Sequence, residues 1–300
     1  MLRWAPEGGV LFDLRRAGRI AAAARDAGAA RIVPGARLLD VCTFVEAEIR
    51  RHGGQLAFPV QSSVNHIAAH YCPGPQDTAR YHDGDLAKLD VGVHVNGHVV
   101  DTALTVHVGR TSDHVLIEAA RAALEAGLAV AGAGVPVRRV SAAIEAAMHA
   151  FGATPMHNLC GHGVGHYDVH CHPPIPNRAD DSAHCLPVGA AVAIEPFATD
   201  GAGWVSEHGE PQVFRLDPGY ACGPDASPLL EAIQAFRGLP FARRQLAAWP
   251  AAEVEETLTW LREQGALGGY APLAENEGRR VAQAEHTIYL GRNGAEVLTR

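Results

Sequence analysis

The 300-residue sequence predicts an α+β fold. Helix-like and strand-like stretches are mixed along the chain without the regular strand–helix–strand repeat of a parallel sheet. The strongest local signal is Asn96-Gly97, because this dipeptide between alternating apolar residues is typical of a tight β-hairpin. An apolar fraction of 47% provides ample core. We therefore expect one mixed α and β domain over residues 1–300.

The first elements of the chain are expected to be helices. A stretch rich in Ala and Arg predicts a helix over about residues 11–31, and Pro34-Gly35 ends it. A second helix is expected over residues 38–52, where a pair of glycines follows. Residues 58–71 then have the character of a strand, a loop and another strand.

The hairpin is expected over residues 86–106. A two-residue turn places Gly92 opposite Asp101 and makes Asp90 the diagonal neighbour of Asp101 on the same face. Diagonal side chains in a sheet lie about 7 Å apart, which would allow two carboxylates to hold metal ions roughly 3.5–4 Å apart. A β-bulge would shift this register. The other face is aliphatic and is expected to be buried, with Leu89, Val91, Val93, Val95, Val100, Leu104 and Val106.

The rest of the chain mixes helices with short strands. Helices are expected over residues 112–131, 137–151, 228–236 and 251–264. Residues 156–200 read as short strands and loops broken by Gly and Pro. The stretch 205–272 changes character and offers no obvious ligand, so it is predicted to be a helical insertion. A strand hairpin over residues 284–298 closes the fold.

Composition limits the partners of the protein. A net charge of −8 argues against nucleic acid or an anionic membrane as the main partner. The sequence has no run of 18 apolar residues that would predict a transmembrane helix, and residues 1–7 lack the apolar core of a signal peptide. Its six cysteines are scattered without a Cys-x-x-Cys pair, which favours reduced thiols in a cytoplasmic protein.

Five residues form a candidate metal-binding set. His162 lies in a glycine-rich turn, which would let its imidazole approach a metal closely. Glu195 and Glu285 follow apolar strand residues, where a charge is costly unless it is paired or bound to metal. With Asp90 and Asp101 they make four carboxylates and one imidazole, a donor set that suits divalent Mn, Fe, Co or Zn.

Each of these signals has an ordinary structural alternative. Two Asp residues beside a hairpin are more often a solvated face, and Gly-His-Gly is more often a simple turn. His70 alone would more often be a hydrogen-bonded core residue. A structural zinc site is a competing hypothesis for the segments His170-Cys171-His172 and His184-Cys185, although their spacing fits no zinc finger. The order and spacing of the whole set carry the argument.

In that order the residues resemble the methionine aminopeptidases. The shared pattern is an Asp, a second Asp eleven residues later, a His in Gly-His-Gly, a Glu before Pro-Phe and a late Glu before His-Thr. Five segments resemble the archaeal form of the type II branch, namely parts of 58–71 and residues 89–94, 193–199, 239–244 and 285–287. The resemblance covers nearly the whole chain. It implies a pita-bread fold with a dimetal site at its centre, and it implies that residues 205–272 are the type II helical insertion.

The resemblance also implies roles for the metal-binding set. Asp90 would bind one ion, and His162 and Glu195 would bind the other. Asp101 and Glu285 would bridge the two ions, which would be Co, Mn, Fe or Zn. A bridging hydroxide would attack the carbonyl that follows an N-terminal Met.

Further residues are implied to handle the substrate. Glu195 would pass a proton to the leaving amine, and His70 and His170 would contact the substrate and stabilise the tetrahedral intermediate. Phe58 and Pro59 would line the pocket for the Met side chain. The chain departs from the family pattern at Cys72, Trp204 and Ala284, and its residues 163–166 are more similar to related subfamilies than to type II.

The implied function is removal of the N-terminal Met from nascent proteins and peptides in the cytoplasm. The family is monomeric and leaves room for a transient association with the ribosome. One alternative is an Xaa-Pro aminopeptidase, but those enzymes carry an extra domain before the first Asp and only 89 residues precede Asp90. The other is a catalytically silent pita-bread binding protein, but such relatives have lost ligands and carry basic extensions.

Overall fold

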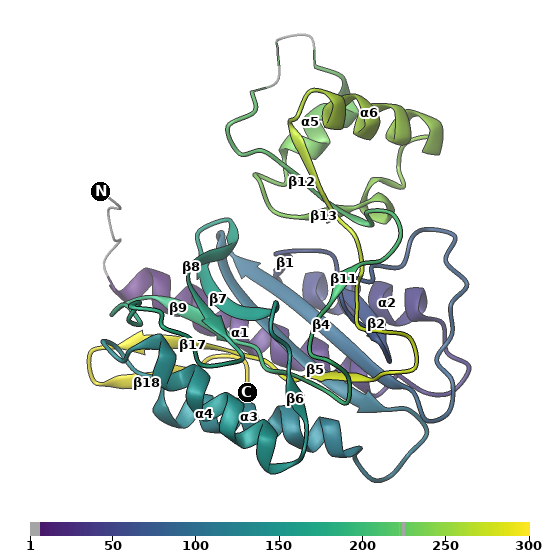
Figure 1. The fold of residues 1–300 in the computed structure, drawn as a ribbon. Coiled ribbons are helices and arrows are strands. Elements are labelled where there is room, and N and C mark those ends of the chain that lie inside the picture. The colour runs from purple at the N-terminus through teal and green to yellow at the C-terminus, as the bar shows by residue number, and fades with distance from the viewer. Residues whose placement is uncertain (1–6, 222, 224–225) are drawn as a thin grey trace.

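The computed structural model describes residues 7–221, 223 and 226–300. Figure 1 shows a broad body of helices and sheets from which a smaller unit projects. Cys222 and the first six residues, for which the sequence predicted a reduced thiol and no signal peptide, lie outside the described residues. No helix in the described part of the chain has both the length and the apolar character needed to cross a membrane.

Two helices cover one face of the central hairpin. Helix α1 (Glu7–Ala29) packs on both hairpin strands, and α2 (Leu38–Arg51) packs beside it. Aliphatic residues from the helices and from the odd-numbered positions of the first hairpin strand form one core here. Gly28 permits the close approach, because a Cβ there would lie 2.3 Å from Val45 and 2.9 Å from Leu89.

The central hairpin has the predicted register. Strands β4 (Leu86–Val95) and β5 (His98–His107) pair Gly92 with Asp101 and Asp90 with Ala103, without a bulge. Positive φ angles of 51° at Asn96 and 85° at Gly97 are those of a type I′ turn. Strands β1 (Gln55–Leu56) and β2 (Gln61–Val64) pair with β4 from its other edge.

The face that carries the two Asp residues is also buried, which the sequence did not indicate. Lys88 and His94 on this face are only 1% and 8% exposed. Strand β16 (Val281–Gln283) packs over the hairpin, and the Lys88 ammonium donates to the backbone oxygens of Asn65, Leu86 and Val281. The hairpin is therefore an interior element with cores on both sides.

A second, five-stranded sheet lies across from the hairpin. Its strands follow the order β18, β17, β9, β7 and β8. Their bounds are β7 (Cys160–Gly165), β8 (Asp168–Pro176), β9 (Ala191–Ile194), β17 (His286–Gly291) and β18 (Gly294–Val297). Helices α3 (Val115–Val130) and α4 (Val137–Ala150) share an apolar core with this sheet and cover it on the outside (Figure 1).

Two small sheets join the segments between these layers. Strand β10 (Phe197–Thr199) lies between β16 and β6 (Thr154–Pro155). Strand β15 (Leu273–Ala274) lies between β11 (Ser206–Glu207) and β3 (Ile67–Ala69). Segments that are far apart in the sequence are thus held side by side near the centre of the body.

The projecting unit has its own sheet and its own core. Its elements are β12 (Val213–Leu216), α5 (Pro228–Gln234), β13 (Phe241–Ala242), η1 (Arg243–Leu246), α6 (Ala251–Glu263) and β14 (Leu267–Tyr270). Twelve buried apolar residues form its separate core. Ser206–Glu207, inside the predicted insertion 205–272, pair with the body instead. The division into one catalytic domain and an insertion stays a prediction.

The predicted helices are all present, with ends that differ by a few residues. The largest difference is at α1, predicted from about residue 11 and observed from Glu7, and α3 begins at Val115 where residue 112 was predicted. His114 accepts a hydrogen bond from the backbone amide of Leu116 and caps the helix there, which its residue type did not suggest. The region 156–200 contains longer strands than expected. Strands β7 and β8 pair with each other along their length, although the register of this pairing shifts at two places.

Candidate active site

Five strands bring the five predicted ligands together. Asp90 and Asp101 come from β4 and β5, and His162 from β7. Glu195 follows β9 and Glu285 precedes β17, and these strands pair His286 with Ile194, so the two Glu residues are neighbours. The backbone amide of Glu285 also donates to Ala103 of the hairpin, which ties the two sheets together at this point.

Three carboxylates of this cluster, those of Asp90, Asp101 and Glu285, have buried oxygens that lack hydrogen-bond partners among the described residues. Asp101, His162 and Glu285 each offer a ligand atom, and these atoms lie within 4.8 Å of one another. Glu285 is fully buried, and neither of its carboxylate oxygens has a hydrogen-bond partner. One carboxylate oxygen each of Asp90 and Asp101 is also unpartnered. Such atoms are costly in a protein interior, and a bound cation would satisfy them.

The electrostatics of the cluster disfavour further negative charge. Burial, opposed in part by hydrogen bonds, raises the pKa of Asp90 to about 7. Burial and then the neighbouring carboxylates raise the pKa of Asp101 and of Glu285 well above the usual range, and burial followed by Asp90 does so for Glu195. Burial lowers the pKa of His162 to about 3, so its imidazole is neutral, as a metal ligand must be.

A shell of polar residues holds the ligands in place. The Gln283 side-chain amide donates to Glu195 over 2.7 Å. The Thr287 hydroxyl donates to the backbone oxygen of Asp101 and accepts from its amide. The sequence interpretation missed Gln283 and Thr287. Their positions two residues before and after Glu285 were the available signal, because alternate residues of an extended chain share a face.

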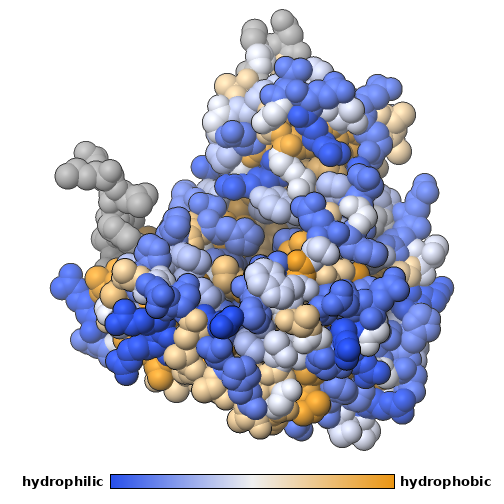
Figure 2. Space-filling view, in the orientation of Figure 1, coloured by the Kyte–Doolittle hydropathy of each residue, from blue (hydrophilic) through white to orange (hydrophobic). Residues whose placement is uncertain are grey.

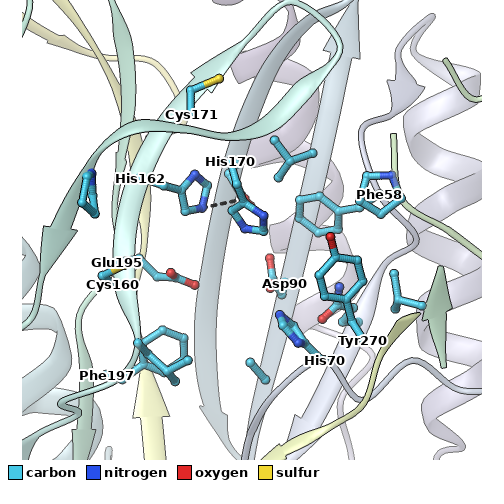
Figure 3. Close-up of a pocket in the computed structure, with 18 of the residues that line it drawn as sticks. Phe58, His70, Asp90, Cys160, His162, His170, Cys171, Glu195, Phe197 and Tyr270 are labelled. Atoms are coloured by element: carbon cyan, nitrogen blue, oxygen red, sulfur yellow. Dashed lines mark ion pairs between the residues drawn. The ribbon is translucent and has the colours of Figure 1, made fainter. Parts of the chain in front are cut away.

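The cluster opens into a cavity of about 360 Å³. Of the predicted site residues, seven line it: Phe58, His70, Asp90, Asp101, His162, His170 and Glu195. Figure 3 shows His162 and Glu195 on one side, Phe58 and Tyr270 on the other, and Asp90 between them. Glu285 lies behind this wall, and Pro59 is buried but is not among the lining residues. The pocket role of Pro59 therefore stays a prediction.

The projecting unit completes the cavity wall. Val213, Pro240 and Tyr270 line the cavity from this unit, and the hollow between the unit and the body is visible in Figure 2. The sequence interpretation missed these three residues, because it looked for ligands and found none in this stretch. Apolar residues far along the chain carry no local signal that they face a distant site.

Two neutral histidines face the cavity. Burial and then His170 lower the pKa of His70 to about 4, and burial lowers the pKa of His170 as well. The His70 ring lies edge-on to Tyr270 at 5.9 Å, and the His170 ring lies edge-on to His162 at 4.4 Å. His70 has a φ of 65°, a strained conformation for a residue with a side chain. Neutral imidazoles can donate a hydrogen bond to a developing oxyanion.

The alternative zinc site is not formed. Within the part of the chain that the structure describes, the one group of at least three ligand atoms is that of Asp101, His162 and Glu285. The Cys171 thiol instead donates to Asp168, and Cys185 is exposed. The rings of His172 and His184 are near each other, with centroids 6.0 Å apart, but no third ligand joins them.

Comparison with known proteins matches this chain to metallopeptidases. Residues 13–234 match the profile of metallopeptidase family M24. A methionine aminopeptidase of Archaeoglobus fulgidus is 38% identical over 289 residues, covering 96% of this chain and 97% of the relative. One of Thermococcus kodakarensis is 40% identical over 290 residues, covering 95% and 98%.

Solved structures share the fold. A methionine aminopeptidase of Thermotoga maritima superposes with a TM-score of 0.72 at 24% identity and full coverage of both chains. A prolidase of Pyrococcus furiosus gives a TM-score of 0.61 at 19% identity, covering 98% of this chain and 64% of its own. At these identities the likeness concerns the fold, which is the pita-bread fold.

Proposed function

The chain belongs to metallopeptidase family M24 and is a metal-dependent aminopeptidase that removes N-terminal methionine, and we propose that the cluster around Asp101 is its catalytic metal centre. The observation that carries this proposal is the convergence of Asp101, His162 and Glu285 on one buried point with unpartnered carboxylate oxygens. No similar group of ligand atoms is found elsewhere among the described residues.

The donor set fits two divalent ions. Asp90, Asp101, Glu195 and Glu285 supply oxygen donors, and His162 supplies one nitrogen, a mixture that suits Co, Mn, Fe or Zn. Asp101 and Glu285 would hold the ions together with Asp90, His162 and Glu195. When bound, the ions polarise the scissile carbonyl and activate a water molecule at neutral pH.

The remaining steps belong to side chains that face the cavity. His70 and His170 would donate hydrogen bonds to the carbonyl oxygen of the substrate as negative charge develops on it. Glu195, oriented by Gln283, would take the proton from the attacking water and deliver it to the leaving amine. Phe58 and Tyr270 would hold the methionine side chain in the apolar part of the cavity.

The proposed substrate is a peptide or nascent protein that begins with Met. The curated relatives are named for this activity, and the net charge of −8 gives no indication of nucleic-acid binding. Action in the cytoplasm, as a monomer in transient contact with the ribosome, belongs to the same proposal.

The test is release of the first Met from Met-Gly-Met-Met. Metal-stripped protein is assayed with Co, Mn, Fe or Zn added back, and calorimetry counts the ions bound per chain. We expect metal-dependent release, two ions per chain, and loss of activity in Glu195→Ala. Glu255→Ala, which changes an exposed residue of α6, is the control and should retain activity.

Two other outcomes would contradict the proposal. Cleavage of an Ala-Pro peptide without release of Met would identify an Xaa-Pro peptidase. A folded protein without turnover in any metal would identify a binding protein with an intact ligand set.

A further inference from the structure

Trp204 presents an exposed ring on a rigid backbone. The residue is 58% exposed. On its N-terminal side, buried Glu275 accepts hydrogen bonds from the backbone amides of Gly203 and Trp204. On its C-terminal side, the Val205 backbone amide donates to Asn158 Oδ1 over 3.0 Å, and Asn158 Nδ2 donates to the Val205 backbone oxygen over 2.8 Å. Four hydrogen bonds thus fix the backbone that carries this exposed aromatic ring.

The segment that carries this ring is joined to the wall of the active-site cavity. Asn158, which grips Val205, lines the cavity, as do the next two residues along the chain. The Cα of Trp204 is one residue step, about 3.8 Å, from that of Val205. The strand that follows, β11, belongs to the same small sheet as β3, whose last residue Ala69 also lines the cavity. The rim and the cavity wall are therefore one connected structure.

A histidine widens the surface that Trp204 offers. The rings of His157 and Trp204 are 5.3 Å apart, centroid to centroid, with an angle of 36° between their planes. Gly203 permits this approach, because a Cβ there would lie 2.8 Å from the His157 ring and from the Pro155 backbone oxygen. We call the pair His157 and Trp204 the rim platform.

A peptide substrate must leave the cavity across its rim. A cavity of about 360 Å³ is of the size that encloses a small ligand, so it holds only the first residues of a polypeptide. An extended chain advances roughly 3.3–3.6 Å per residue, and the residues after the first two therefore lie on the surface beside the cavity. Trp is among the residues that contribute most to binding at such surfaces.

We propose that the rim platform is a subsite for an apolar or aromatic side chain of the substrate, downstream of its second residue. This inference rests on the proposed function, because it assigns the path of the same peptide. It also gives a role to Trp204, whose bulk was a departure from the family pattern. The subsite would make the enzyme selective for substrate residues that follow the second one, which is the residue that cleavage exposes as the new N-terminus.

The test compares hexapeptides that differ at one downstream position. The parent is Met followed by five Gly, and Phe replaces the third, fourth or fifth residue in turn. We expect wild-type protein to prefer one Phe peptide over the parent through a lower KM. In Trp204→Ala this preference in kcat/KM should fall about three- to tenfold, the range expected for one aromatic pair. Trp204→Phe should keep most of it.

Trp260→Ala is the matched control. Trp260 is 44% exposed on α6, in the projecting unit and outside the residues that line the cavity, so its loss should leave the preference unchanged. The inference is overturned if wild-type protein shows no preference, or if Trp204→Ala lowers turnover of every peptide by the same factor. Failure of the proposed function is distinct, because wild-type protein would then release no Met from any peptide.

Discussion

Gln283 touches a proposed metal ligand without being one. Its side-chain amide donates to Glu195, and its backbone is held by Thr105 through two hydrogen bonds. Gln283→Leu keeps the bulk and removes the donor, and we expect kcat/KM and metal affinity to fall about 10–100-fold. Peptide kinetics and metal titration measure the change. Gln264→Leu, at an exposed position after α6, is the control; unaltered metal affinity in Gln283→Leu would refute this role.

Protonation of His94 should make the free energy of unfolding depend on pH. Burial and then Arg237 lower its pKa from 6.5 to about 4, so the folded state holds it neutral. The unfolded chain then binds the proton more readily, and the stabilisation is present above pH 6.5 and lost as the pH falls toward 4. We expect His94→Gln to flatten the decline of unfolding free energy over this window, by about 1–3 kcal/mol in urea titrations. An unchanged slope would contradict it.

The positions of site residues could be predicted from the sequence where they depend on neighbouring residues. The turn at Asn96-Gly97 fixes the register that places Asp90 and Asp101 on one face, and the structure confirms this register. The contribution of Tyr270 to the cavity was not readable, because it depends on how a distant strand is placed over the site. The metal and substrate roles of the predicted residues stay predictions.

Among the elements, η1 is attached to the body by one buried ion pair. The Arg244 guanidinium donates to Glu46 of α2 and, over 2.6 Å, to the backbone oxygen of Val60. Both charged side chains are 6% exposed. Arg244→Ala would leave buried Glu46 with only the Val60 amide and the Arg50 guanidinium, 4.0 Å away, as partners, so we expect a loss of about 3–5 kcal/mol in unfolding free energy. Arg243→Ala, which breaks a more exposed pair with Glu255, should cost about 0–1 kcal/mol.

The same attachment has a kinetic consequence for catalysis. Because the cavity shares Pro240 and Tyr270 with the projecting unit, loosening η1 should raise KM more than it lowers kcat. Arg244→Lys should restore little, since an ammonium lacks the planar set of donors that reaches four acceptors, on Glu46, Val60, Cys72 and Pro73. Equal stability of the Arg243 and Arg244 variants in urea would show that the buried pair is not an anchor.

Elements were predictable to the extent that their patterns are local. Helical periodicity and the glycines and prolines at the ends predicted α1 to α6 but not the short helix η1, and the start of α3 depends on a His cap that sequence rules do not favour. The strand order β18-β17-β9-β7-β8 joins segments from opposite ends of the chain. No local pattern specifies such pairings, because they are decided by the packing of the whole body.

At the scale of the whole molecule, metal binding and folding are coupled. The buried carboxylates repel one another, so divalent ions that bind only the folded state should stabilise it by about 2.7 kcal/mol at a concentration 100 times the Kd. We expect a rise in Tm of several degrees with Mn or Co, reversed by a chelator, in a thermal scan. Asp101→Asn should abolish most of the rise, and the surface variant Asp113→Asn should preserve it.

The ligand set has a consequence for the order of synthesis. Four of the five proposed ligands lie between residues 90 and 195, and Glu285 follows only after the projecting unit has been made. Its strand β17 then pairs with β9, which was synthesised about ninety residues earlier. A chain still emerging from the ribosome therefore lacks a complete centre until residue 285 is free. In the proposed arrangement the centre is completed in one late step, when β17 pairs with β9.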